Sequence, residues 1–488
     1  MAPDASLDGG SLDCGSGLLL LIRRHIDPLE PGQLLEVRST ESSVEEDLPA
    51  WARLTGNELV ARDRAGDVRT YLIRKAGVSR ASVAPTMPIT PVQKAVAVPT
   101  IHPLSVMGIG SWPRPPWLVR ALHERLAGRL SEDEFQEYAD DAVRLSVAAQ
   151  ERAGVDVVTD GEQRRDNYAS FVAARIDNCQ LIPITDLLPY VTAPEHFAAE
   201  LRGLDVPAER LRHPAVFGRL ARSKPLVGNE LAFAQTLTTR PVKIALPGPY
   251  LLTRTMWLEC VSDQAYPDRE ALACDIVAVL REEVEYLLAA GAALVQFDEP
   301  VLTEVVFARP KAGRTFMCGA LGERREPGEE LAFAGGLIRA VLDGLPRERV
   351  ALHVCRGNWS RDESVALAGP YTPLVPLLAS LPFGTFFLEL ATPRAGELGP
   401  LTDLPAGCRI GVGVVNQKLD GVEAVESIMA KAEAAIRLFG PERVLLNPDC
   451  GFATFADSPM SSAAVAEAKL GAIVRAARLL RKRHGIGD

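Results

Sequence analysis

Eight short apolar segments, rich in β-branched residues, recur in the last four fifths of the chain, and helical or loop sequence separates each from the next. They are Val106–Ser111, Val155–Gly161, Val242–Gly248, Ala293–Asp298, Val350–Cys355, Gly384–Leu390, Arg409–Val415 and Arg443–Pro448. Buried strands that alternate with helices are typical of parallel sheets, since parallel strands need a crossover between them. Eight such strands predict an α/β protein with a (β/α)₈ TIM barrel.

The intervals between these segments fit a barrel. Apolar residues recur at helical spacing in Ala271–Ala290, Glu329–Leu345 and Val422–Leu438. The interval from Arg164 to Thr239 is longer than a simple crossover needs. We expect an insertion there that acts as a lid or sets substrate specificity.

The N-terminal residues predict a small two-layer α/β domain. From Ser11 to Lys75 the order is βαβαββ, with a short strand, a helix over Leu18–Ile26, a strand over Leu34–Ser39, a helix over Val44–Leu54, and strands over Glu58–Arg62 and Val68–Arg74. Residues 78–100 are rich in Ala, Val, Pro and Thr and predict an extended linker. We therefore expect a domain at 1–77, a linker at 78–100 and a barrel at 101–488.

Charge and composition narrow the expected partners. The net charge is −10, and the only basic cluster is the short Arg481-Lys482-Arg483, which argues against nucleic acid or an anionic membrane surface as partner. No apolar run has the length and flanks of a signal peptide or membrane span. We expect a cytoplasmic protein that acts on small molecules and keeps its eight cysteines as thiols or metal ligands.

Polar residues follow seven of the eight predicted strands. They are Ser111, Glu162, Asp298 with Glu299, His353 with Cys355, Glu389, Asn416 with Lys418, and Asp449 with Cys450. Active sites of (β/α)₈ barrels are built at the carboxyl ends of the strands, so these residues are expected at one mouth of the barrel.

Three of these residues predict a metal site. His353 and Cys355 lie two residues apart on one strand, so their side chains point to the same face. Cys450 meets them if the barrel closes, and Glu389 can supply an oxygen as a fourth ligand. Thiolates with an imidazole and one exchangeable position fit catalytic Zn²⁺ better than magnesium or calcium. Five further cysteines are expected in helices or loops as ordinary thiols, namely Cys179, Cys260, Cys274, Cys318 and Cys408.

Five motifs resemble the catalytic barrel of cobalamin-independent methionine synthases and of single-barrel relatives such as epoxyalkane:coenzyme M transferases. They occur in the same order from about Met107 to the C-terminus. They are Ile109-Gly110-Ser111-Trp112-Pro113, Asp160-Gly161-Glu162-Gln163-Arg164-Arg165, Asp298-Glu299-Pro300, His353-Val354-Cys355-Arg356-Gly357-Asn358-Trp359 and Asn447-Pro448-Asp449-Cys450-Gly451-Phe452.

The resemblance implies a mechanism in which zinc, held by His353, Cys355 and Cys450 with Glu389 as exchangeable ligand, binds a substrate thiol as thiolate. The thiolate attacks an electrophilic carbon. Ser111, Glu162, Asp298 and Trp359 are then expected to bind a homocysteine-like thiol, with Glu162 and Asp298 pairing with its ammonium group.

The sequence departs from this family after the seventh strand. Methionine synthases carry a histidine there, thought to aid protonation of the folate leaving group, whereas this chain has Asn416-Gln417-Lys418. Asn416 or Lys418 can take that role, or the electrophile needs no acid. The methyl or alkyl donor therefore stays open between a folate, a corrinoid and another compound.

The N-terminal domain resembles the TusA-like sulfur-carrier family, through Leu12-Asp13-Cys14, Glu30-Pro31-Gly32 and Tyr71-Leu72-Ile73-Arg74-Lys75. In that family a cysteine at the start of the first helix carries a persulfide. Cys14 occupies this position, although Gly15-Ser16-Gly17 replaces the family's usual Pro-x-Pro. The resemblance implies a persulfide-donating protein partner, and a helix N-terminus favours the Cys14 thiolate.

Three functions follow from these observations. The first is zinc-dependent methyl transfer to homocysteine or a similar thiol. The second is sulfur transfer, in which a persulfide on Cys14 supplies the sulfur of a new thiol such as homocysteine. The third is a non-catalytic, zinc-stabilised scaffold that displays a sulfur carrier.

Overall fold

A computed structural model describes residues 3–12, 18–26, 28–42, 44–54, 57–75, 100–183, 212–257, 265–307 and 325–487. The chain divides into two compact units, one formed mainly by residues 1–90 and the other mainly by residues 91–488. Nearly all of the predicted linker lies outside the described residues. The boundaries at 77 and 100 therefore stay predictions.

The first unit is a four-stranded sheet with two helices. Its elements are β1 (Ala5–Asp8), α1 (Leu19–Ile26), β2 (Leu34–Ser39), α2 (Val44–Leu54), β3 (Glu58–Ala65) and β4 (Val68–Arg74), in the sheet order β1-β2-β4-β3. Strands β1 and β2 are parallel, and the other pairs are antiparallel. The predicted βαβαββ order is found, but its first strand ends before Ser11. This strand is only four residues long, and two of them are polar, so its sequence gives little periodicity to recognise.

Apolar faces of both helices form the core of this unit. Leu18, Ile22 and Ile26 recur every four residues along α1, and Val44, Leu48 and Trp51 recur at helical spacing along α2. These side chains pack with Leu35, Val37, Tyr71 and Ile73 of the sheet, all nearly inaccessible to solvent.

The second unit contains a closed barrel. Six parallel strands are neighbours in chain order: β7 (Lys243–Pro247), β8 (Leu294–Asp298), β9 (Val350–Val354), β10 (Thr385–Leu388), β11 (Arg409–Val415) and β12 (Val444–Pro448). Single parallel bridges complete the ring, joining Val106 to Leu446, Met107 to Val157, and Val158 to Val242. Each predicted strand thus has its place in the barrel, although the first two are paired only by these bridges.

The inside of the barrel is packed with apolar side chains from several strands. Met107, Ile109, Val157, Leu294, Ala351, Phe387 and Leu445 form a buried cluster. This filling is typical of a (β/α)₈ barrel, whose centre is a core and not a channel.

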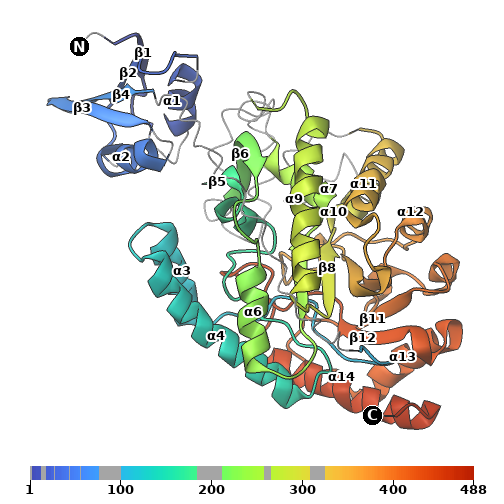
Figure 1. Ribbon diagram of the computed structural model, residues 1–488. Helices are drawn as coiled ribbons and strands as arrows, with labels where there is room; N and C mark the ends of the chain where they lie inside the picture. Colours follow the sequence, from blue (N-terminus) through green and yellow to red (C-terminus); the bar gives the residue numbers. More distant parts are fainter. Residues whose placement is uncertain are drawn as a thin grey trace. The chain divides into compact units, whose positions relative to one another are not determined.

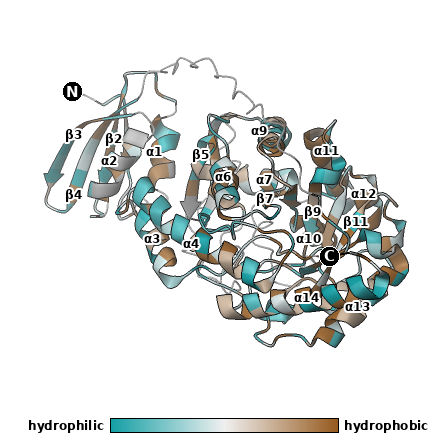
Figure 2. Ribbon diagram, turned by 60° about the horizontal axis from the view of Figure 1, so that its bottom comes forward, coloured by the Kyte–Doolittle hydropathy of each residue, from teal (hydrophilic) through white to brown (hydrophobic). Residues whose placement is uncertain are grey.

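Helices surround the barrel (Figure 1). They are α3 (Pro116–Leu126), α4 (Glu132–Ala153), α6 (Gly228–Leu237), α7 (Pro249–Met256), α9 (Arg269–Ala289), α10 (Val301–Phe307), α11 (Pro327–Leu342), α12 (Val375–Ser380), α13 (Val425–Phe439) and α14 (Ala463–His484). The predicted helical intervals correspond to α9, α11 and α13. Figure 2 shows both hydrophilic and hydrophobic residues on α13 and α14, which pack against β12.

The long connection after the second strand holds a small sheet. Strands β5 (Asp177–Pro183) and β6 (Arg212–Ala221) pair with each other, while residues 184–211 lie outside the described part. Its role as a lid stays a prediction. Cys179 lies on β5, so its expected place in a helix or loop was wrong. None of the described helices is long and apolar enough to cross a membrane.

Candidate metal and substrate site

Three predicted metal ligands lie together at the carboxyl ends of β9 and β12. One ligand atom each from His353, Cys355 and Cys450 lies within 4.8 Å of the others, and all three residues are buried. His353 Nε2 lies 3.4 Å from Cys450 Sγ. The barrel therefore joins two ligands from one strand with a third that is nearly a hundred residues away.

The hydrogen bonds of the three residues suit a cation. His353 Nδ1 lies 3.2 Å from the carbonyl oxygen of Phe387 and donates to it, so Nε2, which is hydrogen-bonded to Cys450 Sγ, is the nitrogen that can bind a metal. The Cys450 thiol donates to Cys355, and this bond lowers the pKa of Cys355 well below its usual value. Two sulfurs and one imidazole nitrogen form a donor set that fits Zn²⁺.

Glu389 is buried beside this cluster but is bonded elsewhere. Its Oε2 accepts from the backbone N–H of Arg356 at 2.8 Å, and its Oε1 accepts from Arg394 Nη2. It is not part of the three-residue group described above. Each of its oxygens thus already accepts one hydrogen bond, and its place in the metal shell stays a prediction.

Glu162 faces the pocket from a constrained backbone position. It has φ +55° directly after Gly161 at +76°, a region that is costly for residues other than glycine. Its N–H donates to Asp160 Oδ1 at 3.0 Å, and its carbonyl oxygen accepts from Arg114 at 2.7 Å. Burial raises the pKa of Glu162, whose Oε2 has no partner among the described residues.

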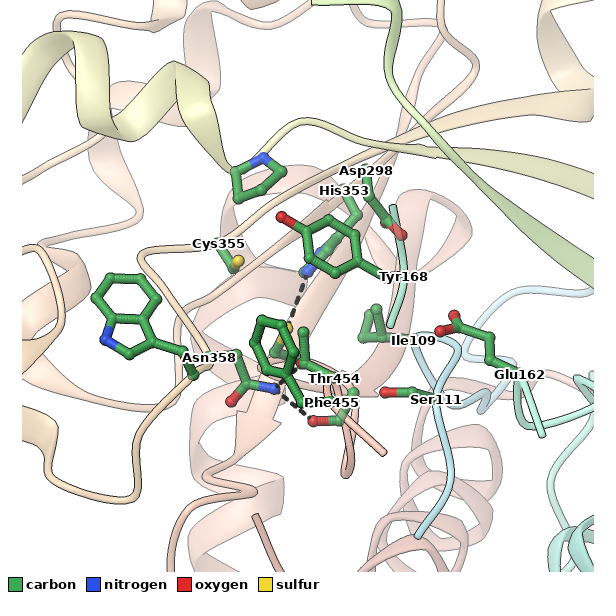
Figure 3. Close-up of a pocket in the computed structure, with 14 residues that line it drawn as sticks. Ile109, Ser111, Glu162, Tyr168, Asp298, His353, Cys355, Asn358, Thr454 and Phe455 are labelled. Carbon is green, nitrogen blue, oxygen red and sulfur yellow. Dashed lines mark hydrogen bonds between the residues drawn. The ribbon is translucent and has the colours of Figure 1, made fainter. Parts of the chain in front are cut away.

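Asp298 ends β8 and is the second carboxylate of the pocket. Its Oδ1 accepts from Gln296 Nε2 at 2.7 Å. Burial raises the pKa of Asp298 to about 7, and the nearby Glu162 adds to the rise. In the view of Figure 3, Asp298, Glu162 and Ser111 lie on one side of His353, with Cys355 on the other.

Ser111 and Trp359 also line the pocket. Ser111 Oγ accepts from the N–H of Ala453 at 3.3 Å, which ties the end of the first strand to the loop after β12. Trp359 is folded closely over Gly357, where any side chain would overlap the indole ring. Both residues thus line the pocket, and their contact with a substrate stays a prediction.

The predicted metal ligands and the two carboxylates line one pocket, which has a volume of about 540 Å³ together with the solvent at its opening. Its walls include Tyr168, Phe455 and Asn358, which the sequence prediction missed (Figure 3). Asn358 Nδ2 donates to Gly451 O and Thr454 Oγ1, at 2.7 Å each. These residues lie in loops without periodicity, so only their closeness to the predicted motifs could have signalled them.

The loops that carry the two aromatic residues are bonded to each other. Asn167 and Phe455 form an antiparallel bridge, and the N–H of Ala456 donates to Asp166 O at 2.8 Å. Tyr168 and Phe455 are therefore held beside the metal-ligand cluster by backbone contacts between the second and eighth loops.

Asn416 and Lys418 lie in the loop after β11 and do not line this pocket. Asn416 bonds the backbone N–H of Lys418 through Oδ1 and Glu363 through Nδ2, so its side chain orders its own loop. Lys418 Nζ is buried and has no hydrogen-bond partner among the described residues. Cys14 lies outside the described residues, so its predicted role stays untested.

A family model described as the catalytic domain of cobalamin-independent synthases matches residues 104–325 and 338–478. A second model, described as sulfurtransferase TusA, matches residues 17–75. Both matches agree with the resemblances found in the sequence.

Individual proteins with similar sequences point to the same family. A methionine synthase of Sulfurisphaera tokodaii is 28% identical over 346 residues, covering 70% of this chain and 84% of that protein. A 5-methyltetrahydropteroyltriglutamate–homocysteine methyltransferase of Acidithiobacillus ferrooxidans is 26% identical over 378 residues, 77% of this chain and 42% of the relative.

A solved structure has the same barrel fold. It is a B12-independent methionine synthase from Shewanella, with a TM-score of 0.59 at 23% identity over 78% of this chain and 98% of that one. With the family model spanning most of the second unit, the chain belongs to the cobalamin-independent synthase family.

Proposed function

We propose that this chain is a zinc-dependent methyltransferase that methylates the thiol of homocysteine or of a similar amino acid. The observation that carries the proposal is one pocket that holds a His-Cys-Cys cluster together with two buried carboxylates. The names of the relatives support it, and the Shewanella structure was solved with selenomethionine, an analogue of the methylated product.

His353, Cys355 and Cys450 are the residues that fit the metal. Zinc held there would act as a Lewis acid that lowers the pKa of a substrate thiol. The chain itself orients His353 through the Phe387 carbonyl oxygen. Because Tyr168, Phe455 and Trp359 line the same pocket, they limit the access of water to the reacting sulfur.

Glu162 and Asp298 provide the charge that an amino acid substrate needs. An ammonium group placed between them lowers the pKa of both carboxyl groups, so binding and ionisation favour each other. The unpartnered Oε2 of Glu162 is the acceptor left for this group. A thiol without an amino group leaves two buried carboxylates unpaired, which disfavours its binding.

The methyl donor stays open between a folate and a corrinoid. Asn416 is bonded within its loop, whereas Lys418 presents a buried ammonium without a partner among the described residues. Of the two, Lys418 is the better candidate to protonate a leaving group. A donor whose leaving group needs no proton makes either residue dispensable.

Product analysis tests the proposal directly. Zinc-loaded protein is incubated with homocysteine and, separately, with methyltetrahydrofolate, its polyglutamate form or methylcobalamin, and methionine is measured by mass spectrometry. We expect methionine with at least one donor and none with C355S protein. C408S, which alters another buried thiol, is the matched control and should keep activity. No methionine from folded, zinc-loaded protein with any donor contradicts the proposal.

Sulfur transfer is the second candidate, because the sulfurtransferase match covers residues 17–75, just after Cys14. In this function the outer sulfur of a Cys14 persulfide attacks an activated carbon of the substrate and displaces its leaving group, which forms a disulfide. An external thiol reductant then cleaves that S–S bond and releases the new thiol. A C14S variant should then stop formation of the thiol, while C274S, which changes an exposed cysteine of α9, should not. Unchanged turnover in C14S contradicts this candidate.

A further inference from the structure

Lys243 is a fully buried lysine inside the barrel. It belongs neither to the His-Cys-Cys cluster nor to the residues that line the pocket. It begins β7, and its Nζ donates to Gly108 O at 2.7 Å and to Gln296 Oε1 at 2.6 Å. The ammonium also lies 4.4 Å from the centroid of the Phe387 ring. Burying such a charge is unfavourable unless it is paired, a cost that an apolar residue would not incur.

The hydrogen bonds of Lys243 have a fixed direction. Burial lowers the pKa of Lys243 to about 7, and in its ammonium form the group can only donate, so the amide of Gln296 turns its oxygen toward Lys243. Its nitrogen then faces Asp298 and donates to Oδ1 at 2.7 Å. The chain of bonds runs from Lys243 through Gln296 to Asp298, and all three side chains are buried.

This chain of hydrogen bonds determines which oxygen of the Asp298 carboxylate is available to a substrate. With Oδ1 of Asp298 held by Gln296, Oδ2 is the atom left for a ligand in the pocket. The positive charge of Lys243 also lowers the pKa values of Asp298 and Glu162, opposing the effect of their burial. Lys243 therefore favours the two charges that an ammonium group needs.

We propose that Lys243 is a positioning residue, which orients the Asp298 carboxylate through the Gln296 amide and so selects thiols that carry an amino group. The inference rests on the proposed function, since it assigns the substrate ammonium to Asp298. Lys243 touches neither the substrate nor the metal ligands in this role. Its removal should weaken recognition of the amino group alone.

Binding of two thiols separates this role from a structural one. Homocysteine and 4-mercaptobutanoate, which differ only by the amino group, are titrated by calorimetry into zinc-loaded wild-type and K243M protein. We expect K243M to bind homocysteine about tenfold more weakly and 4-mercaptobutanoate as well as the wild type does. Equal weakening of both thiols, or undiminished binding of homocysteine, overturns the inference.

A second variant and a matched control keep the test decisive. Q296M breaks the same chain of hydrogen bonds in the middle and should weaken the binding of homocysteine selectively. This variant tests the inference even if K243M fails to fold. The double variant should be no worse than either single one, because both remove one interaction. K469M removes another fully buried lysine, bonded to Gly421 and Glu423, and should leave the ratio of the two affinities unchanged.

Failure of the inference can be told apart from failure of the proposed function. Wild-type protein that binds neither thiol contradicts both. Wild-type protein that prefers homocysteine, together with K243M and Q296M proteins that keep this preference, contradicts only the role of Lys243.

Discussion

Gly110 lies against the carboxylate of Glu162, so closely that a methyl group at Gly110 would overlap Glu162 Oε1. The loop after the first strand thus has no side chain at the point where the second loop places its acid. The motif Ile109-Gly110-Ser111 is needed here for space as well as for its hydroxyl group.

We therefore expect G110A to displace Glu162 and weaken homocysteine binding. Loss of one hydrogen bond to a charged group costs about 1.5–3 kcal/mol, which corresponds to a KM about 10- to 100-fold higher. G108A is the matched control, since a methyl group at Gly108 meets nothing within 4 Å. Steady-state kinetics with homocysteine measure the effect, and equal KM values for the two variants would refute it.

Metal removal distinguishes a catalytic site from a scaffold. After chelation we expect activity to be lost while circular dichroism and the melting transition keep a folded barrel, because the barrel core is independent of the three ligands. Collapse of the fold on chelation supports the zinc-stabilised scaffold instead. C450S should lower the zinc content per chain, measured by mass spectrometry, and C408S should not.

Asp160 should make stability depend on pH. Burial, with the nearby Glu230, raises the pKa of Asp160 from 3.8 to about 7. Between these pH values the folded protein keeps a proton that the unfolded chain releases. The contribution of Asp160 to the free energy of unfolding therefore falls as the pH rises toward 7 and stays constant above pH 7. Each pKa unit is worth roughly 1.4 kcal/mol.

The variant D160N lacks this proton and can still accept the bond from the Glu162 N–H. Its melting temperature relative to wild type should therefore rise between about pH 5 and pH 7 and then level off. D141N, at an exposed ion pair with Arg144, gives the effect of losing a carboxylate at the surface. A difference between D160N and wild type that is constant with pH contradicts the prediction.

The ion pair between Arg165 and Glu230 should be important for folding. The two side chains are 1% exposed and lie 2.7 Å apart. Removing one partner of a buried pair leaves the other charge uncompensated and costs about 3–5 kcal/mol. Urea unfolding of E230Q should show this loss. E467Q breaks an exposed pair with Arg152 and should cost below about 1 kcal/mol.

Much of the barrel could be predicted because its strands carry a local signal. Runs such as Val350–Cys355 are short, apolar and bounded by turns, and His353 and Cys355 share a face by strand geometry alone. Cys450 could be added because closure of a barrel brings all strand ends to one mouth. These inferences depend on periodicity and topology, both of which the sequence carries.

Other parts of the site have no such signal. Lys243 stands at the start of a strand, where a lysine is ordinarily expected in solvent, and only the structure shows its ammonium inside the barrel. Tyr168 and Phe455 come from loops that are joined by a bridge between distant residues. The bonds of Glu389 to Arg356 and Arg394 depend on side-chain geometry that no residue spacing reveals.

The first two strands of the barrel are held by single bridges, so the two halves of the site should differ in the free energy needed to open them locally. Ser111 and Glu162 follow strands joined by one bridge at a time, whereas the predicted metal ligands follow β9 and β12, which belong to the six-stranded parallel sheet. Segments with few backbone hydrogen bonds open at lower free energy. In native-state hydrogen exchange, amides around Val157 should exchange before those around Leu352, so the half that is proposed to bind the amino acid should open first.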